Sequence, residues 1–334
     1  MSSQLSRTGE WFLNSGVQQP NGGVARYYRV GEGYLPASTE ITGYAVSFFV
    51  YLHSVAGDKR YLEAAERGAR FLVSAWDPKL CIMPFEINPP RYSYFFDCGI
   101  IVRGLLAAWR ATGEEQFRTV AVQIGNSMER DFAGADGDYH PILKLPEKTP
   151  VERDNTRWSR NAGCYQLKSA MAWWDLFEAT GDPCFQKPYL KVREYSLASY
   201  STFLDIPVVM DRLHAFSYFL EGILPRPQAL DHAISLAAAA LRAHAPQFVR
   251  SDVYGQLLRA RLFADWAGAV PLDHWQGAEE ADALAAFQRA DGGWWFGRKN
   301  GDMMPFINPV SAAFASQALD LWERREPINR HLLV

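Results

Sequence analysis

One sequence motif, a turn between two helices, occurs three times along the chain. The segments SVAGDKRYLEAAERGARFL, RATGEEQFRTVAVQIGNSM and EATGDPCFQKPYLKVREYS each place a glycine and then an acidic residue between two helical stretches. These glycines, Gly57, Gly113 and Gly181, are 56 and 68 residues apart. Glycine suits the left-handed residue after a helix, and the acidic residue complements the N-terminus of the next one. Repeats of this period predict stacked helical hairpins, and 334 residues leave room for six of them.

Apolar residues recur at helical spacing between glycine and proline breakers, which predicts about twelve helices. They cover residues 3–15, 38–55, 59–75, 93–111, 114–131, 159–179, 183–203, 210–223, 228–245, 251–267, 277–289 and 308–324. No segment shows the alternation of a half-buried strand. Alternate helices, such as FFDCGIIVRGLLAAW, are apolar on most faces, whereas partners such as EEQFRTVAVQIGNSM carry a polar face. The pattern predicts an all-α protein, with residues 1–334 forming a single α/α toroid domain of six helical hairpins. The first helix would lie beside the last.

Long irregular segments alternate with short turns. Each leads from an expected outer helix into an inner one, and they cover residues 16–37, 77–92, 132–158, 204–209 and 290–307. In an alternating ring they all reach the same face, where the free N–H groups of the inner helices favour anions. Functional loops are commonly carried by a rigid scaffold. This face is therefore the candidate site.

Charge and composition exclude several classes of protein. Lys plus Arg is 34 and Asp plus Glu is 37, so the net charge is −3 and the basic footprint of a nucleic-acid-binding protein is absent. The four cysteines are far apart and form no C-x-x-C motif, which argues against a disulfide scaffold and a thiolate zinc site. His140 and His274 lack metal-ligand spacing. We expect no metal and no cofactor.

No stretch reaches about 18 uninterrupted apolar residues, so no membrane span is expected. The N-terminus lacks the apolar core of a secretory signal. A reduced, cytoplasmic protein is the default expectation, and the sequence leaves the oligomeric state open.

Two segments resemble a known repeat. RTGEWFLNSGVQQPNGGVARY and ADALAAFQRADGGWWFG are similar to the QW repeat of squalene–hopene cyclases and related toroids, through Gln18 and Gln288 and the glycines that follow them. The resemblance implies the α/α toroid. The Asp-x-Asp-Asp acid of terpenoid cyclases is absent. The adjacent Asp97 and Cys98 also depart from the zinc-binding Asp-x-Cys of protein prenyltransferase β subunits.

A broader resemblance covers most of the chain. The run GVARYYRVGEGYLPASTEITGYAVSFFVYLHSVAGDKRYLEAAERGARFL looks like the opening hairpins of bacterial six-hairpin carbohydrate-active proteins. That group includes unsaturated glucuronyl hydrolases and epimerase or lyase toroids. The segment from Trp158 to Gly163 is loosely similar to the R-G-N-G-W segment of unsaturated rhamnogalacturonyl hydrolases, without its final Trp. The resemblance implies an enzyme that acts on a uronic-acid-containing or related saccharide.

Four residues are candidates for catalysis. Glu40 falls in the first turn of an inner helix, where apolar surroundings would raise its pKa as a glycosidase acid requires; complementing the helix dipole is the alternative. Asp97 lies among aromatic residues, where a buried carboxylate has either an ion-pair partner or a catalytic role. His214 follows an aspartate that could fix its tautomer, so that the neutral imidazole serves as a base. Asp252 is interpreted first as an N-cap and second as a catalytic carboxylate.

Arginines and aromatic rings near the same face are candidates for substrate binding. Arginine could clamp a uronic acid bidentately, and rings could stack on sugar C–H faces; internal ion pairs and core packing are the alternatives. The candidates are Tyr34, Tyr44, Tyr94, Arg157, Trp158, Arg160, Tyr165, Trp294 and Asn308.

The leading hypothesis is a glycoside hydrolase that uses Glu40 and Asp97 as paired carboxylates on a carbohydrate substrate. A uronate C5-epimerase or polysaccharide lyase is an alternative, with His214 or Tyr165 as base and an arginine to neutralise the carboxylate. An isoprenoid-binding, cyclase-like toroid is a second alternative, and a non-catalytic glycan-binding protein is a third.

Overall fold

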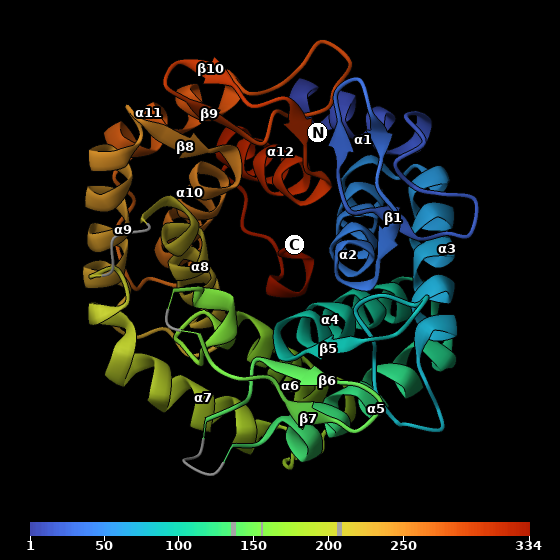
Figure 1. Cartoon of the computed structure of the whole chain (residues 1–334). Coiled ribbons are helices and arrows are strands. Elements are labelled where there is room, and N and C mark those ends of the chain that lie inside the picture. The colour runs from blue at the N-terminus through green and yellow to red at the C-terminus, as the bar shows by residue number, and fades with distance from the viewer. Residues whose placement is uncertain (135–137, 155, 206–208) are drawn as a thin grey trace.

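The computed structural model describes residues 1–134, 138–154, 156–205 and 209–334, and within them the chain forms a ring of twelve α-helices (Figure 1). Six inner helices are α2 (Thr39–Ala56), α4 (Phe95–Thr112), α6 (Gln166–Thr180), α8 (Val209–Gly222), α10 (Ser251–Trp266) and α12 (Pro309–Arg324). Six outer helices are α1 (Ser3–Asn14), α3 (Lys59–Ala75), α5 (Glu115–Phe132), α7 (Gln186–Ser199), α9 (Leu230–His244) and α11 (His274–Ala285). The predicted all-α class and the α/α toroid are confirmed.

The ring closes through its two ends. Each inner helix packs against the next inner helix, and α12 packs against α2. The outer helix α1 lies against α12, so the expected pairing of the first and last helices is confirmed. The turns from inner to outer helices are built as the repeated motif predicts, because Gly57, Gly113 and Gly181 end α2, α4 and α6 with φ of 68°, 75° and 74°.

Two glycines let inner helices touch through their backbones. A Cβ atom on Gly104 would lie 2.5 Å from the carbonyl oxygen of Gly43, where α4 crosses α2. A Cβ atom on Gly99 would lie 2.3 Å from the carbonyl oxygen of Ser169, where α4 crosses α6. Glycine at these positions therefore sets the spacing of the inner ring.

The long connections contain short strands that the sequence analysis did not predict. They are β1 (Val24–Ala25), β2 (Tyr28–Arg29), β3 (Gly33–Tyr34), β4 (Ala37–Ser38), β5 (Tyr92–Tyr94), β6 (Ile142–Lys144), β7 (Thr149–Pro150), β8 (Phe248–Arg250), β9 (Gly297–Lys299), β10 (Asp302–Met303) and β11 (Phe306–Ile307). They form four antiparallel sheets, β1–β4, β11–β2–β3, β5–β6–β7 and β10–β9–β8. Strands of two or three residues are too short to show an alternating pattern. Three of these sheets join neighbouring connections, whereas β1–β4 lies within one connection.

Three helices differ most from prediction, and one of them is α11, which spans His274–Ala285 rather than 277–289. Helix α6 begins at Gln166 rather than at 159, because Trp158–Arg160 forms a 3₁₀ turn and Asn161 is extended. Helix α7 ends at Ser199 and is followed by a separate 3₁₀ turn, Tyr200–Thr202. Of the predicted connection 204–209, residues 206–208 lie outside the described residues.

Residues 329–334 enter the middle of the ring from the end where the inner helices finish (Figure 1). Leu333 and Val334 are fully buried. Arg103 of α4 donates to the carbonyl oxygen of Leu333 at 3.0 Å, and Lys168 of α6 donates to that of Val334 at 3.0 Å. Gln317 of α12 donates to the carbonyl oxygen of Leu332 at 2.7 Å. The segment therefore ties three inner helices together.

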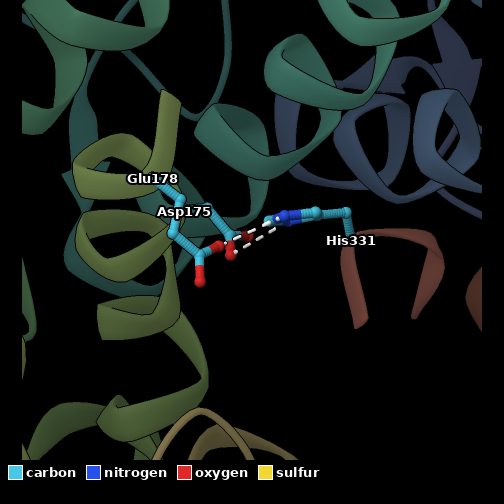
Figure 2. Close-up of side chains that lie close together, drawn as sticks. All are labelled: Asp175, Glu178 and His331. Carbon is cyan, nitrogen blue, oxygen red and sulfur yellow. Dashed lines mark ion pairs between the residues drawn. The ribbon is translucent and has the colours of Figure 1, made fainter. Parts of the chain in front are cut away.

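Side chains of the same segment bind α6. His331 lies against Asp175 and Glu178 (Figure 2), with Nδ1 3.4 Å from Asp175 Oδ1 and Nε2 3.2 Å from Glu178 Oε2. Arg330 pairs with the same two carboxylates. No helix in the described ranges is long and apolar enough to cross a membrane.

Candidate active site

A cavity of about 360 Å³ opens at the face where the inner helices begin. The first turns of α2 and α4 form one wall, and α8, β8 and the turn before α6 form the others. The lining residues are Arg26, Glu40, Phe85, Tyr94, Phe96, Asp97, Pro141, Trp158, Ser159, Tyr165, His214, Tyr218 and Arg250. The structure thus brings together six residues that the sequence singles out: Glu40, Tyr94, Asp97, Trp158, Tyr165 and His214.

A second hollow of about 280 Å³ continues from this cavity. It shares Glu40 and His214 with the cavity and adds Asp252 and Asn308 from the sequence candidates. All four proposed catalytic residues therefore lie around one continuous cleft.

Glu40 and Asp97 form a carboxyl pair at the adjacent N-termini of α2 and α4. Asp97 is 7% exposed, and its Oδ2 has no hydrogen-bond partner among the described residues. Burial raises the pKa of Asp97 well above its usual range, the nearby Glu40 raises it further, and Arg26 opposes the rise. Burial also raises the pKa of Glu40, to about 7, again against the charge of Arg26. The pair therefore retains a proton near neutral pH.

His214 is held as a neutral imidazole. Its Nδ1 lies 2.8 Å from Oε1 of Gln256, a contact that assigns the proton to Nδ1 and leaves the lone pair on Nε2. Burial lowers the pKa of His214 to about 4, and the positive charge of Arg250 adds to the effect. The ring packs edge-on against Tyr218, with centroids 4.6 Å apart. Such an imidazole can accept a proton from a substrate without first losing one.

Asp252 supports an arginine rather than capping α10. Arg250 makes two bonds to it, 3.0 and 2.7 Å long, and Ser311 donates to it at 3.0 Å. Burial by itself would raise the pKa of Asp252, but Arg250 and His214 hold it below the usual value. The expectation of an N-cap is wrong, because Asp252 lies inside the helix and its oxygens point to these partners. Arg250 is fixed further by Asp211 at 2.8 Å.

Sequence reasoning missed Arg26, Arg250 and Tyr218. Arg26 lies over the ring of Phe85, 4.9 Å from its centroid, at the edge of the cavity. Both arginines reach the site from short strands or from the residues beside them, which carry no periodic pattern. Tyr218 was detectable in principle, because it lies four residues after His214 and therefore shares its helix face.

Several predicted binding residues lie elsewhere. Arg157 is exposed and 3.8 Å from Asp154, and neither it nor Arg160 lines the cleft. Trp294 is a core residue, because it is fully buried and its indole donates to Thr8 at 2.8 Å.

Two tyrosines are also outside the lining. Tyr34 borders a separate surface hollow and donates to the carbonyl oxygen of Ser15 at 2.9 Å. Tyr44 is 2% exposed and packs against Phe314, with centroids 5.3 Å apart. Phe314 in turn packs against Tyr218 of the cleft. Tyr44 therefore supports the wall rather than forming it.

One group in the described part of the chain has the donor atoms for a metal ion: Asp175, Glu178 and His331 (Figure 2). It lies at the far end of the ring. Arg103 binds Asp175 at 3.0 Å, and Arg330 binds both carboxylates. Two guanidinium groups already neutralise these oxygens, and their charge opposes a cation. The group is therefore an ion-pair cluster that holds residues 329–334.

No protein-family model and no curated protein matches the chain. Solved structures do match along nearly its whole length. A sugar epimerase from a ruminal bacterium has a TM-score of 0.75 at 10% identity, covering 97% of this chain and 98% of that one. The cellobiose 2-epimerase from Spirochaeta thermophila DSM 6192 has a TM-score of 0.72 at 16% identity, covering 97% and 96%. An α-1,6-mannanase from Salegentibacter sp. HEL1_6 has a TM-score of 0.66 at 12% identity, covering 95% and 98%. At these identities, the likeness shows that this chain has the α/α-toroid fold of these proteins.

Proposed function

We propose that this chain is a carbohydrate-active enzyme that works by general acid–base catalysis at Glu40 and Asp97. The observation that carries the proposal is a proton-holding carboxyl pair in a cavity walled by aromatic rings. The names of the structural neighbours support it, since they describe epimerases and a mannanase, and one mannanase variant is described in complex with α-1,6-mannotetrose. A cleft with three carboxyl groups and two arginines suits a hydroxyl-rich substrate better than an isoprenoid.

Hydrolysis of a glycosidic bond is the first reaction that the pair favours. Asp97 is the more buried partner and would donate its proton to the leaving oxygen. Glu40 would then act as nucleophile, or as the base that activates water. Arg26 balances the charge that remains on the pair.

Proton transfer at a sugar carbon is the second candidate, and His214 is the observation that favours it. Its free Nε2 could take a proton from the carbon beside a carbonyl or carboxylate group. Arg250 could stabilise the oxyanion that forms. It takes the place expected for Arg157 or Arg160, because it lines the cleft and they do not. Return of a proton to the opposite face gives the epimer, and loss of a neighbouring oxygen substituent gives an unsaturated product.

The test is to incubate the protein with neutral and uronic-acid-containing oligosaccharides in heavy-oxygen water and in deuterated water, followed by mass spectrometry. Hydrolysis places heavy oxygen in a shorter product, epimerisation places deuterium on carbon without cleavage, and elimination gives an unsaturated product. Glu40→Gln and Asp97→Asn should stop hydrolysis, whereas His214→Gln should stop proton transfer. The absence of all three products would overturn the proposal. Hydrolysis that survives both carboxyl substitutions together would overturn the first candidate reaction, and proton transfer that survives His214→Gln would overturn the second.

A further inference from the structure

The cleft has two lobes that share five lining residues, and these five residues are called the waist. The waist consists of Arg26, Glu40, His214, Tyr218 and Arg250, which line both hollows. The first lobe is the larger hollow beyond the waist, with Asp97 and Trp158, and the second lobe is the smaller one, with Phe306 and Asn308. Glu40 and His214 therefore border both lobes, whereas Asp97 borders only the first.

Each lobe has its own aromatic wall. In the first, half-buried Trp158 packs edge-on against Tyr165, with centroids 5.0 Å apart. In the second, half-buried Phe306 stacks on Phe296 at 4.4 Å. A half-buried ring offers one face to the cavity, and such a face suits the C–H side of a sugar ring. The two walls belong to distant parts of the chain, since one is built by Trp158 and Tyr165 and the other by Phe296 and Phe306.

The second lobe also carries a directed hydrogen-bond donor. Asn308 caps α12, with its Oδ1 accepting from the backbone N–H of Val310 at 2.8 Å. Its amide nitrogen is left to donate to a hydroxyl or carboxylate oxygen in the lobe. Arg250 is held at the waist by Asp252 and Asp211 and lies 4.5 Å from the Phe296 ring centroid, so its position is fixed before a substrate arrives.

We infer that the substrate spans the waist, with one sugar unit in each lobe, and that a disaccharide unit is the shortest efficient substrate. The inference rests on the proposed function and adds the substrate length to it. A single sugar unit fills one lobe and leaves the other ring wall bare, so it loses the binding energy that aligns the reacting atom with Glu40 and His214.

The experiment compares a monosaccharide with the disaccharide built from it. If the reaction is proton transfer, kcat/KM is compared; if it is hydrolysis, for which a monosaccharide has no bond to break, the Kd of each sugar for the Glu40→Gln variant is compared in its place. We expect the wild-type kcat/KM to be at least about tenfold higher for the disaccharide. Trp158→Ala and Phe306→Ala each remove one wall and should each lower the disaccharide kcat/KM by about tenfold. The control is Trp275→Ala on α11, where the side chain is 68% exposed and remote from the cleft; it should match the wild type.

A monosaccharide must enter one of the two lobes, so its kcat/KM should respond to one of the two substitutions and not to the other. A monosaccharide response to only one substitution indicates loss of a subsite. General damage to the fold would lower the monosaccharide value in both variants. Equal kcat/KM for the two substrates, or full disaccharide activity in both variants, would overturn the inference and leave the proposed function standing. Failure to act on any saccharide would overturn both.

Discussion

Glu40 and Asp97 gain their chemistry from where the fold places them. Each lies in the first turn of an inner helix, and α2 and α4 are neighbours, so two carboxyl groups 57 positions apart share one cavity. Their positions near helix starts could be predicted, because caps and apolar periodicity locate those starts. The positions of Arg26 and Arg250 could not, because each depends on pairing between strands of two or three residues.

Glu40→Gln should abolish activity and stabilise the protein at alkaline pH. Burial raises the pKa of Glu40 from 4.5 to about 7, so the folded chain holds a proton that the unfolded chain releases. The free energy of unfolding therefore falls as the pH rises through this range, a loss that glutamine avoids. We expect activity to fall at least about 100-fold. The Tm should exceed that of the wild type at about pH 8 and match it at about pH 4, below the unfolded pKa of 4.5. A lower Tm near pH 8 would contradict the raised pKa.

Arg26→Gln should move the activity profile toward higher pH. Arg26 lowers the pKa of both Glu40 and Asp97, so its removal raises both values. We expect the carboxyl limb of the kcat/KM profile to shift upward by about one pH unit. Arg26→Lys keeps the positive charge and should therefore return the limb most of the way to its wild-type position. Arg29→Gln is the matched control, since Arg29 is an exposed residue that pairs with Glu32. An unchanged limb in Arg26→Gln would show that the charge does not act on the pair.

At the level of elements, the sequence placed most helices within a few residues because their ends carry strong signals. Gly57, Gly113 and Gly181 end three inner helices in the left-handed conformation that only glycine adopts easily. The start of α6 was predicted seven residues too early, although Asn161 and Gly163 within residues 159–165 are poor helix formers. The structure instead uses this stretch to place Trp158 and Tyr165 in the cleft wall. The error therefore falls at the candidate site, where local preference gives way to function.

Gly104→Ala should loosen the contact between α2 and α4. The new methyl group would lie 2.5 Å from the carbonyl oxygen of Gly43, and a backbone atom cannot move aside as a side chain can. We expect the free energy of unfolding in urea to fall by about 1–3 kcal/mol. Gly68→Ala is the matched control, because its methyl group meets a side-chain methyl of Val46 at 2.7 Å. Equal losses of unfolding free energy in Gly104→Ala and Gly68→Ala would show that the close approach of the α2 and α4 backbones does not determine the cost.

At the scale of the whole molecule, residues 329–334 turn the ring into a cup. They lie in the middle of the ring and bind Asp175 and Glu178 near the end of α6, whereas the cleft lies where α2 and α4 begin. The contacts involve long-range partners, such as Arg330 with Asp175 and Arg259 with Val334. The sequence analysis ended its helices at residue 324 and assigned no structure to this segment. Its position depends on side chains from several inner helices, which a local pattern does not contain.

Arg330→Ala should destabilise the whole ring. Asp175 is 1% exposed and would lose one of its two arginines, while Glu178 would lose a bond of 2.6 Å. We expect the free energy of unfolding to fall by about 2 kcal/mol. Arg118→Ala removes an exposed pair with Glu115 and should change it by less than about 1 kcal/mol. Chemical denaturation of both variants checks the difference. An effect of Arg330→Ala no larger than that of Arg118→Ala would mean that the segment is not anchored there.

The meeting of α1 with α12, and of α12 with α2, also bears on how the protein is made. These contacts join residues from opposite ends of the chain, so a nascent polypeptide has an open edge at α2 until the final hairpin leaves the ribosome. Glu40 shares a hollow with Arg250, Phe306 and Asn308, which are synthesised much later than Glu40 itself. The candidate site therefore lacks part of its lining until Asn308 has been synthesised, and a chain interrupted before that point would carry Glu40 and Asp97 without it.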